Sequence, residues 1–97
     1  MITLLSEKTI EVPFKGSTVY VKFKVPTAID AEEIISSKMK DSAIFKKFAI
    51  EISCKDVEEL DGVFPSKLLE IPGTYPIMNK TALEILNSAI VSEEEKN

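Results

Sequence analysis

The clearest pattern in this sequence is TVYVKFKV, residues 18–25, in which apolar and polar side chains alternate. Successive side chains of a β-strand point to opposite faces of a sheet, so the alternation predicts a strand whose buried face carries Val19, Val21, Phe23 and Val25. A strand that is apolar on one side must pack that side against other elements. The rest of the chain must therefore supply a layer that covers these four side chains.

The segment before this strand completes a hairpin. Residues 9–14 (TIEVPF) alternate in the same way, and Lys15-Gly16-Ser17 between the two runs is typical of a short turn, where glycine tolerates a positive φ. We predict a β-hairpin over residues 8–25. Pro13 has no N–H to donate to a ladder, so we expect the first strand at an edge of the sheet.

Two helices are predicted in the middle of the chain. Thr27 follows Pro26 and is itself followed by Asp30 in an approximate capping box, which predicts a helix over about 28–40. A second helix is predicted from Asp41 or Ser42 to about Cys54, because apolar residues recur there at i, i+3 and i+4: Ile44, Phe45, Phe48, Ala49 and Ile52. Residues 55–65 carry few apolar anchors, and we predict no long element there.

The last third of the chain predicts a long amphipathic helix. Pro72-Gly73 breaks the preceding turn, Thr74 caps the helix, and Pro76 falls in its first turn, where a missing N–H costs nothing. Apolar residues from Tyr75 onward cover well over half of the helix circumference, which is wider than the stripe that a surface helix buries. Either this helix is central to the core, or part of its surface binds a partner.

Length and composition fit one domain. The chain has 97 residues, 44% of them apolar and 29% charged, and no apolar run approaches the ~20 residues of a membrane span. Its first residues lack the pattern of a signal peptide. We predict an α+β domain over residues 1–92, in which an N-terminal β-hairpin packs on about three α-helices, followed by an acidic tail over residues 93–97 that frays.

The residue types that are missing exclude several functions. The sequence has no histidine and no arginine, which removes the usual proton shuttle at neutral pH and the bidentate grip on phosphate. A net charge of −4 argues against binding to nucleic acid. No phosphate-binding loop or nucleophile motif occurs, and the acidic cluster Glu58, Glu59 and Asp61 has too few oxygen ligands for a Ca²⁺ loop. We predict no enzymatic activity, no cofactor and no metal.

Cys54 is the only cysteine, so no internal disulfide can form. We interpret it as a small, partly buried apolar residue rather than a nucleophile. A reducing cytoplasm is the compartment that suits a free thiol.

Several short motifs together resemble a known family. Lys24-Val25-Pro26-Thr27-Ala28 leads into an acidic helix, and Ile71-Pro72-Gly73-Thr74-Tyr75-Pro76 precedes Asn79-Lys80 and the closing helix. This arrangement resembles the small tail assembly chaperones of long-tailed bacteriophages and prophages. The likeness extends loosely over most of the chain and includes no catalytic residues.

The resemblance implies a function and a location. Such chaperones keep the long tape-measure protein soluble, recruit tail-tube subunits around it in the host bacterial cytoplasm, and are absent from the mature virion. Many are made in a short form and in a longer form produced by ribosomal frameshifting. Glu95-Lys96-Asn97 can be encoded GAA-AAA-AAC, which contains a run, A-AAA-AAC, on which two tRNAs can slip back by one base.

A chaperone for a long helical protein needs an apolar helix face or groove. We predict that contacts come from exposed parts of the second and last helices, with Phe45, Phe48, Ile77, Leu83, Leu86 and Ile90 as candidates, and that several copies or a homo-oligomer add avidity. Two alternatives stay open. One is a small acidic binding module of the inhibitor or immunity type, and the other is a minor structural subunit of the tail or baseplate.

Overall fold

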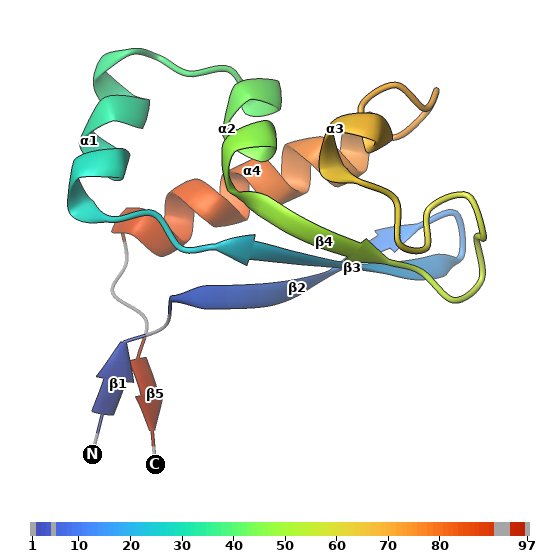
Figure 1. Cartoon of the computed structure of the whole chain (residues 1–97), viewed down its shortest axis with the longest axis horizontal. Coiled ribbons are helices and arrows are strands. Elements are labelled where there is room, and N and C mark those ends of the chain that lie inside the picture. Colours follow the sequence, from blue (N-terminus) through green and yellow to red (C-terminus); the bar gives the residue numbers. More distant parts are fainter. Residues whose placement is uncertain (1, 5, 91–93, 97) are drawn as a thin grey trace.

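The protein has an α+β fold. The computed structural model describes residues 2–4, 6–90 and 94–96. Three strands, β2 (Glu7–Phe14), β3 (Ser17–Lys24) and β4 (Ala49–Ser53), form an antiparallel sheet in the order β2-β3-β4. Four helices complete the domain, and Figure 1 shows them above the sheet, with β2 at its lower border: α1 (Ala28–Ser36), α2 (Asp41–Phe48), α3 (Pro65–Leu68) and α4 (Tyr75–Ile90).

The predicted hairpin is confirmed as β2 and β3. Its register pairs Phe14 with Ser17 across a two-residue turn. Lys15 and Gly16 in this turn both have positive φ, 48° and 78°, which is the type I′ geometry that matches the twist of the two strands. The strand that carries Pro13 lies at an edge of the sheet, as predicted.

The first helix begins as predicted. The Thr27 side chain accepts a hydrogen bond from the Asp30 N–H, and the Asp30 carboxylate accepts one from the Thr27 N–H, both at 3.1 Å, so the capping box is complete. The helix ends at Ser36, earlier than the predicted residue 40. Lys38 follows with a φ of 50°, a left-handed conformation that a continuing helix does not allow.

The second helix is shorter than predicted, and this is a correction. It ends at Phe48, and the chain passes directly into β4, where Ile52 pairs with Val21. Ile44, Phe45 and Phe48 form the buried face of the helix, while Ile52 is buried from a strand. Residues 49–54 read AIEISC, whose alternation and β-branched isoleucines are a strand signal that the helical spacing concealed.

The segment after β4 is irregular and is held at three points. The Cys54 N–H donates to the Asp61 carboxylate at 3.1 Å, and the Gly62 N–H donates to the Ile52 carbonyl at 2.8 Å. Leu60 is buried beneath this segment. The segment therefore returns to the outer side of β4, and α3 contacts the same strand.

The last helix begins at Tyr75 and ends at Ile90, close to the predicted range. Thr74 precedes it and is buried, and its hydroxyl donates to the Leu68 and Ile71 carbonyls at 2.9 and 2.8 Å. The Thr74 hydroxyl thus joins the α3 turn to the start of α4.

The two ends of the described chain lie side by side. Strand β1 (Ile2–Leu4) pairs antiparallel with strand β5 (Glu94–Lys96). Figure 1 shows this pair apart from the main sheet. The acidic tail predicted to fray thus contains a strand over residues 94–96, while residues 93 and 97 lie outside the described residues.

One core joins the sheet to the helices. Alternate side chains of the three strands point toward the helices and are buried: Ile10, Val12, Val19, Val21, Phe23 and Ile52. Helix α4 packs on β2 and β3, and α1 and α2 pack on α4. The opposite face of the sheet is polar, with Glu7, Thr9, Tyr20, Lys22 and Glu51 among its residues.

Candidate protein-binding surface

Helix α4 has one face in the core. Its buried side chains are Ile77, Thr81, Ala82, Ile85 and Ser88. The two buried hydroxyls are satisfied within the helix, since Thr81 donates to the Ile77 carbonyl at 2.7 Å and Ser88 donates to the Ile85 carbonyl at 2.8 Å. This face of the helix therefore belongs to the core and is not accessible to a partner.

The opposite face of α4 carries apolar side chains that the domain does not cover. Leu83 is 57% exposed and Ile90 is 62% exposed, while Leu86 between them is partly buried against the core. Their spacing of three and four residues places them on one side of the helix. Together with Glu84 and Asn87 they line an open hollow of ≈ 310 Å³. We refer to Leu83, Leu86, Asn87 and Ile90 as the α4 outer face.

Half of the predicted contact residues are core residues instead. Phe45 and Ile77 have no exposed surface and Phe48 is 3% exposed. This corrects the expectation that they contact a partner, because a fully buried side chain cannot do so without unfolding. The prediction assigned α2 an exposed apolar part, but α4 and α3 pack against α2 and its apolar stripe, Ile44, Phe45 and Phe48, is buried in the core.

The structure also exposes apolar residues that the sequence reasoning did not select. Ile29 and Ile35 on α1 are 79% and 58% exposed, and only Ile34 and Ala31 of that helix are buried. Near the opposite end of the domain, Phe64 and Tyr75 are also exposed. Helix α1 has only nine residues and buries a narrow stripe, so its other isoleucines remain exposed. The short length of this helix is the signal that the prediction missed.

Asp30 is the one described residue whose carboxyl has a clearly shifted pKa. The Thr27 backbone N–H, followed by the Thr27 side chain, holds the pKa of the exposed Asp30 carboxyl below its ordinary value of 3.8. This shift belongs to the helix cap. Among the described residues, no group of three or more His, Cys, Asp or Glu side chains is placed to hold a metal ion.

Cys54 is buried, and its Sγ lies 3.6 Å from the Ser17 hydroxyl. That hydroxyl donates to the Asp56 carboxylate at 2.9 Å, so its proton is directed away from the sulfur. These contacts join the start of β3 to the segment after β4, and we interpret them as structural.

Comparison of the chain with protein-family models, with curated proteins and with solved structures found no match. Within the described ranges, no helix combines the length and the apolar character that crossing a bilayer requires. The α4 outer face therefore has to be interpreted from its own chemistry.

Proposed function

We propose that this protein is a non-catalytic binding protein of the tail-assembly-chaperone type, which holds an apolar helical face of the tape-measure protein on the α4 outer face and aids recruitment of tail-tube subunits. The observation that carries the proposal is the exposure of Leu83 and Ile90 beside the partly buried Leu86. A row of apolar side chains at helical spacing, with a hollow between them, suits another amphipathic helix.

The surroundings of this face fit a chaperone of limited affinity. Three apolar side chains form a much smaller patch than the roughly 800 Å² that each partner buries in a standard interface. A single contact is therefore weak, and stable coverage of a long client requires many copies along it. The net charge of −4 helps keep such a loaded complex in solution.

The test is co-expression with the tape-measure protein encoded in the same phage genome, with the soluble fraction of that client measured after centrifugation. The wild-type protein is expected to keep the client soluble. The double variant Leu83→Gln/Ile90→Gln is expected to lose most of that effect while keeping its own fold, because both side chains are more than half exposed.

The chain offers a matched control. Ile29→Gln/Ile35→Gln changes two isoleucines of comparable exposure on α1 and leaves α4 intact. Loss of solubilisation in both double variants would mean that general surface hydrophobicity is responsible rather than the α4 outer face. A wild-type protein that leaves the client insoluble would contradict the chaperone function itself.

Stoichiometry separates this function from an inhibitor-type module, which would bind one defined partner in a single complex. Mass spectrometry of finished virions separates it from a structural tail subunit, since a chaperone is absent there.

A further inference from the structure

The edge of the sheet at β2, which no described strand covers, is a second feature that points to binding. The other edge, at β4, is approached by the Gly62 N–H, which donates to Ile52, and by α3. Strand β2 pairs only with β3 among the described strands. An uncovered edge strand presents backbone donors and acceptors to which another chain can add.

The register of the hairpin shows which backbone groups face outward. The Val25 N–H donates to the Ser6 carbonyl at 2.9 Å, and hydrogen-bonded pairs recur every second residue from there to the turn pair Phe14 and Ser17. The residues between these pairs direct their backbone groups away from β3. They are Glu7, Thr9 and Glu11, each with an N–H and a carbonyl, and Pro13 with a carbonyl alone.

Pro13 therefore occupies a position where its missing N–H breaks no bond of the ladder. It also ends the row of outward donors. The edge available for strand addition thus extends over about seven residues, from Glu7 to Pro13, and offers three N–H groups.

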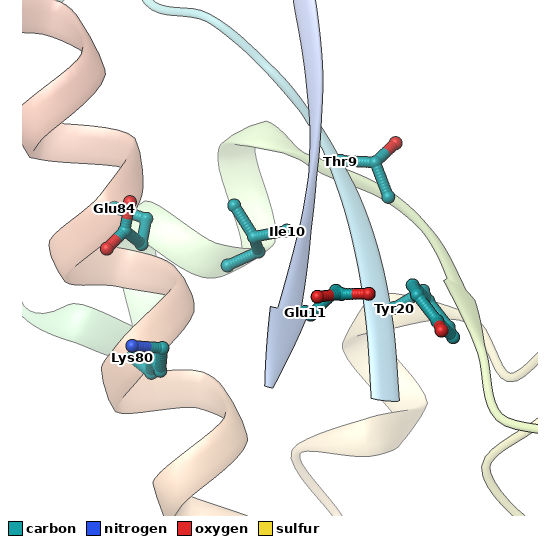
Figure 2. Close-up of a pocket in the computed structure, with 6 residues that line it drawn as sticks. All are labelled: Thr9, Ile10, Glu11, Tyr20, Lys80 and Glu84. Carbon is teal, nitrogen blue, oxygen red and sulfur yellow. The ribbon is translucent and has the colours of Figure 1, made fainter. Parts of the chain in front are cut away.

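Space for an added strand lies beside this edge. Thr9, Ile10 and Glu11 of β2, Tyr20 of β3, and Lys80 and Glu84 of α4 line an open hollow of ≈ 510 Å³. Figure 2 shows Ile10 directed toward α4, while Thr9, Glu11 and Tyr20 lie on the other side of the strand. An added strand would place alternate side chains against Ile10 on one face and against the row of Glu7, Thr9 and Glu11 on the other.

The charges along the β2 edge indicate which kind of strand can pair with it. Glu11 makes no ion pair with any described residue, whereas the Glu7 carboxylate lies 3.3 Å from the Lys22 ammonium. Both carboxylates are on the polar face of the sheet, opposite the helices. Pairing of two copies symmetrically about Thr9 is disfavoured, because it places Glu7 of each copy opposite Glu11 of the other. A basic strand instead gains a favourable pair at each of these positions.

We infer that the β2 edge binds an extended segment of a partner protein, which adds as a fourth strand and carries lysine or arginine opposite Glu7 and Glu11 with small apolar residues on the alternate face. Backbone hydrogen bonds would supply most of the affinity and the charge pairs the selectivity. This site is separate from the α4 outer face and stands whether or not the chaperone function is correct.

The probe is the blocked peptide Val-Lys-Val-Thr-Val-Lys-Val, whose sequence reads the same in both directions and so fits a parallel or an antiparallel addition. It places its two lysines opposite Glu7 and Glu11 and its threonine opposite Thr9. Titration followed by amide NMR is expected to move the Glu7, Thr9 and Glu11 signals and to slow hydrogen exchange at those three amides. The same peptide with glutamate in place of lysine is expected to bind about tenfold more weakly, since two cross-strand pairs become repulsive.

Two controls separate strand addition from surface adsorption. N-methylation of the threonine removes the peptide donor that faces β2 in an antiparallel addition, and N-methylation of the valine after it removes a donor that faces β2 in a parallel addition. Both changes leave the protein as it is, and one of the two is expected to weaken binding about tenfold. Thr9→Pro removes an outward N–H from the protein, at a position of the same type as Pro13, whereas Thr9→Ala changes the side chain and keeps that N–H. Binding should survive in Thr9→Ala and be lost in Thr9→Pro.

The inference is overturned if the lysine peptide shows no saturable binding up to millimolar concentration, or if neither N-methylated peptide binds more weakly. It is also overturned if the shifted amides lie along α4 at Leu83 and Ile90 instead of along β2. Because the Leu83→Gln/Ile90→Gln variant keeps β2 intact, it is expected to bind the peptide normally, which distinguishes a failure at this edge from a failure at the α4 outer face.

Discussion

Ile77 and Leu83 are six residues apart on the same helix and have opposite roles. Ile77 is fully buried in the core, whereas more than half of Leu83 is exposed. A sequence pattern on a helix that is apolar over most of its circumference cannot separate the two, because burial depends on which neighbours the rest of the chain brings. For this reason, Ile77→Asp is expected to unfold the domain rather than remove partner binding alone.

Alanine substitutions at these two positions test the assignment. Ile77→Ala is expected to lower the free energy of unfolding by about 2–5 kcal/mol, because it leaves a cavity in a packed core. Leu83→Ala is expected to change it by no more than about 0.5 kcal/mol. Urea denaturation followed by circular dichroism measures both, and equal losses at the two positions would mean that the outer face of α4 is not exposed in solution.

Asp30 gives a prediction about pH. Its carboxyl pKa is lowered below 3.8 by the Thr27 backbone N–H and side chain, so the ionised form is favoured in the folded state. A depressed folded pKa contributes stability above the unfolded pKa, and this stability is lost as the pH falls through the folded pKa. An NMR titration should give a midpoint below 3.8 for Asp30 in the folded protein, and Asp30→Asn should reduce the acid sensitivity of stability. A midpoint at or above 3.8 would show that the capping box is open in solution.

Among the elements, the hairpin and the first helix cap could be predicted closely because their signals are local. Strict alternation from Thr18, a Lys-Gly turn and the Thr27 and Asp30 pair each specify a conformation within a few residues. The boundary between α2 and β4 could not be predicted, because Ile52 fits both a helical stripe that begins at Ile44 and a strand that pairs with Val21. The tertiary pairing with β3 decided in favour of the strand.

The candidate site could also be predicted only in part from the sequence. The sequence indicated that the last helix has more apolar surface than one buried stripe needs, and exposure of Leu83 and Ile90 agrees with that. The sequence could not show that Phe45 and Phe48 are covered, because α4, which packs on α2, comes from a distant part of the chain. The open edge of β2 also depends on knowing that β4 pairs on the other side of β3.

The hairpin turn offers a prediction for one element. Lys15 has a φ of 48°, which asparagine adopts at lower cost, and Asn-Gly is the preferred pair for a type I′ turn. Lys15→Asn is expected to raise the free energy of unfolding by about 0.5 kcal/mol, less the contribution of the Lys15 contact with the Phe14 ring. Gly16→Ala is expected to lower it by about 1 kcal/mol, because φ is 78° there. Thermal unfolding measures both, and a stabilising Gly16→Ala would contradict the turn type.

At the scale of the whole molecule, the α4 outer face and the β2 edge are adjacent surfaces of different chemistry. Glu84 lines the hollow beside each of them. One is apolar and suits a helix, while the other presents backbone groups and acidic side chains to an extended segment. A partner with a helix followed by a basic extended segment could use both, and two weak contacts on one chain would then combine into avidity.

The same acidic side chains are expected to disfavour self-association at β2 in the register centred on Thr9. In a symmetric pairing about Thr9, Glu11→Lys would replace two repulsive Glu–Glu positions with two Glu–Lys pairs, which favours the dimer by about 1–2 kcal/mol or about tenfold in Kd. Sedimentation velocity over a concentration series measures this. Glu58→Lys makes the same change in net charge on an exposed loop and should leave self-association unchanged. If both variants associate equally, reduced net charge is the cause, and if neither associates more than the wild type, like-charge repulsion is not what keeps this edge open.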